Sequence, residues 1–232
     1  MFLQDRRTNQ LIDALPRASQ RRLLEAADTV QLDYKRVLAA KGDELSHVFF
    51  PTSSFISLLV PADRGRLEVA VVGREGFFGV GVSLGARRSE LEAIVQGAGA
   101  AVRLAAPDFL ALLRDDRSLR RQVDRYAYLM LSQVARSAAC NRFHVVEQRL
   151  ARWLLMTADR SHSASFRITH EFLAYMLGVR RVGITKAATA LQHRQLITYA
   201  RGAVTILDRK GLERASCRCY RSDLSTYARV FG

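Results

Sequence analysis

The sequence predicts an α+β fold with an N-terminal β-roll of the jelly-roll type, one long helix, and a C-terminal unit of helices with a short hairpin. Nine of the 14 glycines lie between Gly42 and Gly99, none lies between Gly99 and Gly178, and all four prolines lie in the first 107 residues. Because these residues cluster in turns and are rare inside helices, we expect strands first and helices afterwards. The spacing of apolar residues also changes after the glycine-rich part, from every second residue, as in a strand, to every third or fourth, as in a helix. The expected segments are residues 1–113, 114–140 and 141–232.

The first segment is expected to consist of short strands separated by turns. Leu67, Val69 and Val71 alternate with other residues, as in a strand with one buried face. Short alternating strands at this spacing favour an antiparallel sandwich or jelly roll. One or two short packing helices are expected before them, on the leucines Leu11, Leu15, Leu23 and Leu24. The expected strands are Val30–Tyr34, His47–Phe50, Phe55–Val60, Arg66–Val72, Leu91–Gln96 and Ala101–Leu104.

A helical pattern begins at about Arg114. Apolar residues recur there at spacings of 4, 3, 4 and 4, which is the period of an amphipathic helix. Such a stripe has two interpretations: it packs on its own domain, or it pairs with the same helix of a second copy in a homodimer. Under the second interpretation the dimerisation residues are Leu119, Val123, Tyr126, Met130 and Val134. The helix is expected to break around Ala139–Asn141, and a second helix follows.

The charge of the chain indicates a polyanionic partner. Lys and Arg number 36 against 22 Asp and Glu, which gives a net charge of +14. Residues 1–140 account for +4 of this charge and residues 141–232 for +10, so the excess is concentrated in the C-terminal part. A solvated, arginine-rich surface is the alternative interpretation, since only four of the 36 cations are Lys. Charge alone does not choose between DNA, RNA and an anionic membrane.

Other classes of protein are disfavoured by composition. No stretch approaches the ~20 apolar residues that span a bilayer, so we expect no membrane partner. The first residues, Met1–Arg7, lack the apolar core of a signal peptide. Three cysteines do not suit a disulfide framework and fit a reducing compartment, so a cytoplasmic protein is expected. No Ser/His/Asp or Cys/His constellation or phosphate-binding loop is evident, and we expect no enzyme.

Residues 169–194 carry the most specific pattern in the chain. Thr169 suits the N-cap of a helix over His170–Leu177, and Gly178 suits the left-handed residue that ends it. A second helix is expected over Arg181–His193. The small Ala174 allows close approach of the two helices, and apolar residues at Leu173, Leu177, Val179 and Ile184 bury their joint. This pattern predicts a helix-turn-helix; the alternative is an ordinary helical hairpin.

The surroundings of this motif favour duplex DNA as the partner. Acidic residues are absent from Leu173 through Leu207, as expected of a surface that lies on phosphates. Two short strands, Leu196–Tyr199 and Ala203–Leu207, follow the second helix and make the motif a winged helix, with Arg201 at the wing tip. The exposed arc of the second helix mixes cations, hydroxyls and one apolar side chain, a set suited to base edges and phosphates.

The chain resembles the CRP/FNR superfamily of transcription regulators over nearly its whole length. The resemblance is strongest at Phe166–Ala174, Gly178–Arg181, Leu196–Ile197 and Ile206–Arg209, and again at Val71–Gly76. It implies a cyclic-nucleotide-binding-like β-roll, a dimerisation helix and a winged helix-turn-helix. It also implies a homodimer, a roughly palindromic double-stranded DNA operator, and RNA polymerase as a partner.

The resemblance also implies roles for individual residues. In the best-known members the second helix begins with Arg then Glu, and a later Arg also contacts bases. Arg181 and Lys186 match the two basic positions, but Val182 stands in place of the Glu, so the operator is expected to differ from the commonest one. Thr169 and His170 match positions that contact the DNA backbone. The predicted DNA-binding residues are Thr169, His170, Arg180, Arg181, Val182, Thr185, Lys186, Thr189 and Arg201.

The residues that match the family's cyclic-nucleotide cassette are unsuitable for that ligand. Val80 stands where a Glu holds the ribose, and Glu90 would repel a cyclic phosphate; Arg87 and Arg88 lie one or two positions early. We therefore expect no usual binding of cyclic AMP, and we name no cofactor.

Metal binding is not predicted either. Family members with an iron–sulfur cluster use four cysteine ligands, whereas this chain has Cys140, Cys217 and Cys219. A redox or metal pair at Cys217 and Cys219 is the less favoured interpretation.

The predicted function is a DNA-binding transcription regulator that is not an enzyme. The alternatives are a small-ligand or cyclic-nucleotide module without DNA binding and an enzyme that merely contains a helical hairpin.

Overall fold

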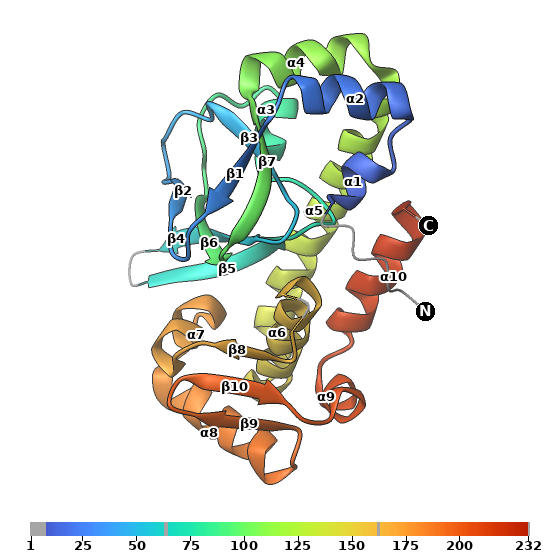
Figure 1. Cartoon of the computed structure of the whole chain (residues 1–232). Coiled ribbons are helices and arrows are strands. Elements are labelled where there is room, and N and C mark those ends of the chain that lie inside the picture. Colours follow the sequence, from blue (N-terminus) through green and yellow to red (C-terminus); the bar gives the residue numbers. More distant parts are fainter. Residues whose placement is uncertain (1–7, 63–64, 162, 232) are drawn as a thin grey trace. The chain divides into compact units, whose positions relative to one another are not determined.

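The computed structural model describes residues 8–62, 65–161 and 163–231 and confirms the predicted α+β fold (Figure 1). The chain forms two compact units. The first contains the described residues of 1–58 and 71–128, and the second those of 59–70 and 129–232. The predicted limits at 113/114 and 140/141 both fall inside helices. Among the described residues, no helix has the length and apolar character needed to cross a membrane.

The first part of the chain contains most of the strands. Its helices are α1 (Gln10–Asp13), α2 (Arg17–Glu25), α3 (Val80–Ser83) and α4 (Ala106–Asp115). Its strands are β1 (Asp28–Leu32), β2 (Val37–Ala39), β3 (His47–Pro51), β4 (Phe55–Ala62), β5 (Gly65–Val72), β6 (Glu92–Gly97) and β7 (Gly99–Ala105). Each of the six expected strands is present, with ends that coincide with the expected ones or differ by one or two residues, while β2 was not predicted.

The strands form two sheets around an aromatic core. One sheet has the order β1-β7-β3 and the other β2-β6-β4-β5. In the first sheet β7 pairs antiparallel with β1 and β3, with Asp28 opposite Arg103 and Val48 opposite Leu104. The ring of Phe77 stacks on Phe50 at a centroid distance of 5.1 Å. These buried rings supply a large apolar area to the core of the first unit.

The long helix α5 (Arg117–Phe143) corrects one prediction. Leu119, Val123 and Tyr126 are exposed by only 1%, 0% and 2%, so they pack inside the protomer. The ring of Tyr126 lies against Phe77, and it fills the space beside Gly76, where a Cβ would meet it at 1.9 Å. A side chain buried in the protomer offers no surface to a partner, and the dimerisation role predicted for these three residues is therefore wrong. Met130 and Val134 are half-buried.

A different face of α5 is exposed. Tyr128 and Leu131 are exposed by 54% and 67%, and Ala135 and Ala138 continue the row on the same face. Their spacings of 3, 4 and 3 are those of a heptad seam. The stripe that the sequence analysis singled out is thus the inward face, and the outward face carries a second, weaker apolar row.

The second part of the chain contains the remaining elements. They are α6 (Val146–Ser161), β8 (Ser165–Arg167), α7 (His170–Leu177), α8 (Arg181–His193), β9 (Ile197–Ala200), β10 (Ala203–Ile206), α9 (Arg209–Ala215) and α10 (Cys219–Phe231). The break before α6 lies at His144–Val145, and the break expected around Ala139–Asn141 does not occur. Asn and Cys cost a helix little compared with Gly or Pro, so α5 continues through Cys140.

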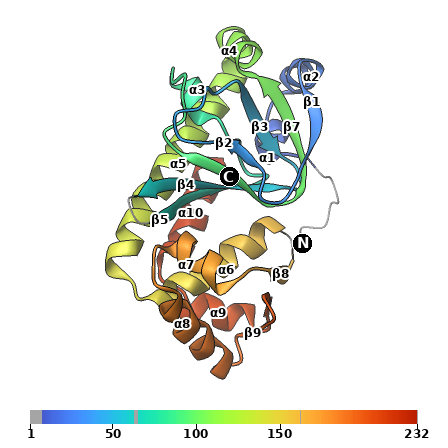
Figure 2. The same cartoon turned by 90° about the vertical axis from the view of Figure 1, so that its left-hand side faces the viewer.

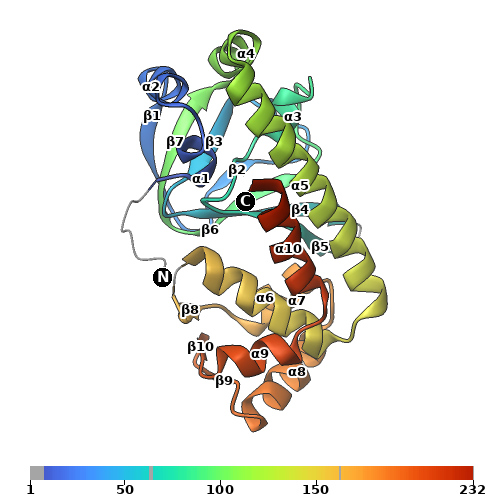
Figure 3. The same cartoon turned by 90° about the vertical axis from the view of Figure 1, so that its right-hand side faces the viewer.

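Helix α6 forms the centre of the second unit. Its residues 149–158 are buried, and it packs against α8 and α9. The three strands lie in the order β8-β10-β9 (Figure 1). Helix α10 lies beside the C-terminal part of α5 (Figure 3), where Arg136 donates to the Thr226 hydroxyl at 3.2 Å.

Candidate nucleic-acid interface

The helix-turn-helix has the bounds that the sequence predicts. The hydroxyl of Thr169 accepts a hydrogen bond from the Phe172 amide at 3.1 Å, which caps the start of α7. Gly178 ends α7 in the left-handed conformation, with φ of 59°. A residue with a Cβ is strained there, so glycine sets the turn between α7 and α8. The pair can be followed in Figure 2.

Helix α8 separates an apolar side from a polar one. Ile184, Ala188 and Leu191 are at most 2% exposed and form its buried face. All the residues predicted to contact DNA from this helix lie on its exposed side: Arg181, Val182, Thr185, Lys186 and Thr189. Val182 is 58% exposed, which is unusual for valine in a packed domain. The arrangement leaves one full arc of α8 available to a ligand.

The cations of this arc have no carboxylate partners. Among the described residues no ion pair involves Arg180, Arg181, Lys186 or Arg201, and all four side chains are exposed. By contrast, Arg194 near the C-terminal end of α8 pairs with Glu147 on α6, with 2.7 Å between Nη1 and Oε1. Positive charge without compensation on one face suits a phosphate backbone.

His170, which is predicted to contact the DNA backbone, also makes contacts within the domain. Its ring stacks on Tyr199 at a centroid distance of 4.5 Å, and Nδ1 lies 3.1 Å from the Thr185 hydroxyl. Its Nε2 is buried and has no partner among the described residues. Burial, together with the charge of Arg181, lowers the pKa of His170. The ring thus lies beside Thr185 on α8, and the contact of His170 with the DNA backbone stays a prediction.

The wing is a tight two-residue hairpin. Ala200 pairs with Ala203, and Arg201 and Gly202 between them have φ of 49° and 74°. Two successive positive φ values are typical of the type I′ turn that matches strand twist. The Tyr199 hydroxyl donates to the Ile168 carbonyl and fixes the base of the wing. The role of Tyr199 was not predicted, because its hydroxyl bonds to Ile168, which directly follows the unpredicted strand β8.

In the β-roll, side chains of the cassette-like segment are engaged locally. Gly79 is left-handed, with φ of 108°, and leads into α3 at Val80. The Arg88 guanidinium donates to the Gly42 carbonyl at 2.7 Å, and the Ser89 hydroxyl donates to the Leu91 carbonyl at 2.6 Å. The carboxylate of Glu90 is exposed. One guanidinium nitrogen of Arg88 is thus bonded to a neighbouring loop, and the Ser89 hydroxyl is bonded within its own loop.

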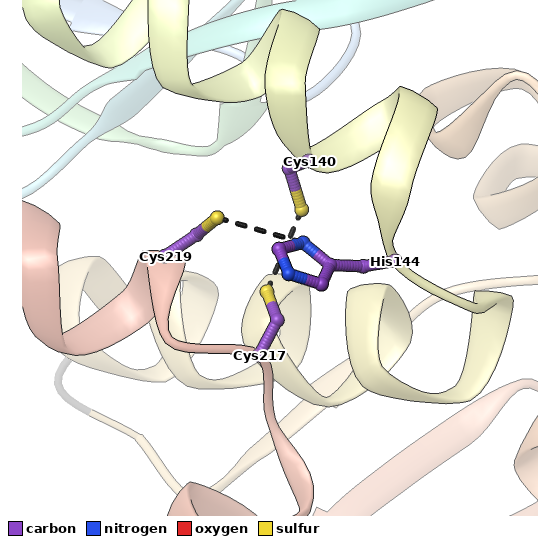
Figure 4. A group of neighbouring side chains, drawn as sticks. All are labelled: Cys140, His144, Cys217 and Cys219. Carbon is purple, nitrogen blue, oxygen red and sulfur yellow. Dashed lines mark hydrogen bonds between the residues drawn. The ribbon is translucent and has the colours of Figure 1, made fainter.

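Four side chains in the second unit could hold a metal ion, which the sequence analysis did not predict. Cys140, His144, Cys217 and Cys219 place one ligand atom each within 4.8 Å of the others (Figure 4). A hydrogen bond between the thiols of Cys140 and Cys217 lowers the pKa of the first and raises that of the second. The signal in the sequence is the spacing of four residues between Cys140 and His144, which suits two ligands one helical turn apart. The cysteines were compared only with one another, so this pair was overlooked.

Comparisons with known proteins agree with the fold and the motif. Residues 148–215 match the family model of the Crp-like helix-turn-helix domain. No curated protein matches the chain. The matched segment spans α6 through α9, which includes the two-helix motif and the wing.

Solved structures extend the similarity to most of the chain. The c-di-GMP-responsive global regulator CLP of Xanthomonas campestris is 16% identical, with a TM-score of 0.70 and coverage of 83% of this chain and 100% of that one. A CRP-family transcriptional regulator from Thermus thermophilus is 20% identical, with a TM-score of 0.67 and coverage of 81% and 96%. A protein from Eubacterium rectale assigned to the CRP/FNR family of transcriptional regulators is 19% identical, with a TM-score of 0.69 and coverage of 91% and 97%. The chain therefore has the fold of the CRP/FNR superfamily and contains its Crp-like helix-turn-helix domain.

Proposed function

We propose that this chain is a homodimeric, sequence-specific DNA-binding transcription regulator. The observation that carries the proposal is the exposed arc of α8, where unpaired cations and the apolar Val182 lie opposite a fully buried face. Such a helix presents charge to phosphates and side chains to base edges at once. The match to a Crp-like helix-turn-helix domain supports the same assignment.

Residues of the interface divide between base and backbone contacts. Arg181, at the start of α8, is assigned to a guanine, to which a guanidinium can donate two hydrogen bonds, and Val182 is assigned to a thymine methyl. Lys186 lies one turn further along the same arc. Arg201 at the wing tip and Arg180 before α8 are assigned to phosphates, which fix position without reading sequence.

The proposed dimer uses the exposed face of α5. Tyr128, Leu131, Ala135 and Ala138 form that face, and a second copy related by a two-fold axis would bury them. Two recognition helices then enter major grooves about 34 Å apart, one DNA turn, on a roughly palindromic operator. Because such a protein acts on transcription, we propose RNA polymerase as a further partner.

The β-roll is proposed not to bind cyclic AMP in the usual way. Val80 offers no acceptor to a ribose hydroxyl, Nη1 of Arg88 donates to the Gly42 carbonyl, and the Ser89 hydroxyl donates to the Leu91 carbonyl. Isothermal titration calorimetry of the full chain with cyclic AMP is expected to show no heat of binding. Binding at micromolar concentration or tighter contradicts this part of the proposal.

Selection of bound sites from a random duplex pool tests DNA binding, symmetry and base preference together. The full chain is expected to enrich a two-fold-symmetric site. Arg181→Ala should cost about 1–3 kcal/mol on that site and relax one position of it, since it removes a base contact. Arg201→Asn, which tolerates positive φ, should weaken selected and random DNA alike and reduce the salt slope by about one. No enrichment by the folded chain, or equal losses on both DNAs for both variants, contradicts the assignment.

A further inference from the structure

Four potential metal ligands converge at the end of α5 in the second unit. Cys140 and His144 lie one helical turn apart at the end of α5, so their side chains project from the same face. Cys217 lies in the segment between α9 and α10, and Cys219 is the first residue of α10. Figure 4 shows all four side chains pointing to one common point. The three cysteines are buried and His144 is half-buried.

Two distances within the group match the edges of a tetrahedral site for a single ion, and all the ligand atoms lie within 4.8 Å of one another. The two thiols of Cys140 and Cys217 are 3.5 Å apart, and the Cys219 thiol lies 3.7 Å from Nδ1 of His144. Zn²⁺ binds sulfur at about 2.3 Å and imidazole nitrogen at about 2.0–2.1 Å, so the edges of its tetrahedron measure about 3.4–3.8 Å. A cluster of several irons spreads its ligands over different metal atoms and would hold the four ligand atoms farther apart than the 4.8 Å found here.

A buried arginine provides a second, independent indication. Arg149 is 7% exposed, and no carboxylate among the described residues pairs with it. Its Nη2 donates to the Leu177 carbonyl at the end of α7, and its Nε has no partner in the described part of the chain. The groups that interact electrostatically with this guanidinium are the thiols of Cys140 and Cys217, which favour its charge, and the guanidinium of Arg152, which opposes it. A buried cation needs a compensating anion nearby.

We propose that Cys140, His144, Cys217 and Cys219 bind one Zn²⁺ in a closed, structural site. Binding converts the three thiols to thiolates and releases their protons to solvent. Three thiolates, a neutral imidazole and Zn²⁺ carry a net charge of −1, which is the anion that Arg149 lacks. Four protein ligands leave no open coordination position, so the ion stabilises structure and does not perform chemistry.

The site would join segments that are distant in sequence. It connects the C-terminal end of α5 with the start of α10, closing a loop of 77 residues between Cys140 and Cys217. That loop contains α6 through α9 and thus the whole helix-turn-helix. Arg149 links the site to the last residue of α7, directly before the turn at Gly178. Zinc binding is therefore expected to stabilise the domain that carries the recognition helix.

Metal analysis of the full chain tests the proposal. The protein is purified under reducing conditions, incubated with Zn²⁺, and freed of loose metal on a chelating resin. Elemental analysis is expected to find one zinc per chain. Replacement by Co²⁺ should give the intense visible ligand-field bands of a tetrahedral site together with thiolate-to-cobalt charge-transfer bands.

Variants separate a ligand role from a packing role. His144→Ala is expected to lose at least tenfold in zinc affinity, whereas His144→Cys should keep one zinc and shift the cobalt spectrum toward four thiolates. His193→Ala is the matched control, because His193 is exposed on α8 and lies outside the group. It should bind zinc like the unmodified chain.

Several results would overturn the proposal. They are a folded, reduced chain that retains no zinc, iron with acid-labile sulfide in place of zinc, or equal zinc binding by His144→Ala and the unmodified protein. If Cys variants fail to fold, the comparison of His144→Ala with His144→Cys still decides, because both keep the three cysteines.

Discussion

Replacing Leu131 with alanine tests whether the exposed face of α5 makes the dimer. In the protomer this side chain is 67% exposed, and it lies at the centre of the row formed by Tyr128, Ala135 and Ala138. A leucine so exposed adds nothing to the fold of the protomer through that part of its surface. If α5 pairs with its twin, the same surface becomes buried, and truncation weakens the dimer.

The magnitude follows from the exposed fraction. Leu131→Ala removes three carbons, each worth ~0.8 kcal/mol when fully buried, or ~2.4 kcal/mol in total. Scaled by the 67% that only a partner can cover, the loss is ~1.6 kcal/mol for each protomer. In a two-fold dimer the loss counts twice, which gives ~3 kcal/mol and a dimer Kd raised by about 100–200-fold.

Sedimentation equilibrium over a concentration series measures this Kd directly. Leu84→Ala is the matched control, since Leu84 is 69% exposed but lies after α3 in the β-roll. It removes the same atoms from a surface of equal exposure and is expected to leave the Kd unchanged. Thermal unfolding of both variants checks that neither loses its fold.

Two outcomes refute the reasoning about α5. A Leu131→Ala dimer within about threefold of the original Kd would mean that this face stays exposed, because burial of even one methylene on each side exceeds that change. Equal weakening by Leu84→Ala would mean that general loss of apolar surface, and not the seam, causes the effect.

Two further predictions concern the stability of the helix-turn-helix. Gly178→Ala should destabilise the chain by about 1–2 kcal/mol, because φ of 59° is unfavourable for alanine. Gly183→Ala inside α8 should stabilise it by about 0.5–1 kcal/mol, because a Cβ there meets open space. Urea unfolding measures both free energies, and a change of the same sign for the two variants contradicts the reasoning. Burial and Arg181 lower the pKa of His170, so its contribution to stability is present above the unfolded value near 6.5 and is lost as pH falls below it. His170→Phe should reduce this decline between pH ~7.5 and pH ~5.5 in urea titrations, and an unchanged decline refutes the role of the imidazole.

Local patterns predicted the helix-turn-helix to the residue. Thr169 caps α7 and Gly178 ends it, because a cap and a left-handed glycine act within a few residues of their own position. Most strands were predicted for the same reason, through alternation and turns. Strand β8 was missed because three residues do not establish a period, and its pairing with β10 is a long-range contact.

The buried face of α5 and the ligand group around Cys140 depend on contacts between distant residues, which the periodicity of the sequence cannot predict. A helical stripe identifies a buried face without saying what buries it. Leu119, Val123 and Tyr126 are buried in the protomer, and the ring of Tyr126 lies against Phe77. The group around Cys140 needs residues 77 positions apart to meet, so only the spacing of Cys140 and His144 could have indicated it.

Helix α5 is the element that gives these features a common role. Its first part packs in the β-roll, where the ring of Tyr126 fills the space beside Gly76, and its last part supplies Cys140 to the ligand group. No glycine or proline interrupts it between these points. Because the Tyr126 ring lies directly against Gly76, any side chain at position 76 would clash with it, and close packing of this kind ties α5 to the Val71–Gly76 segment. The outward face of the same helix is the proposed dimer seam.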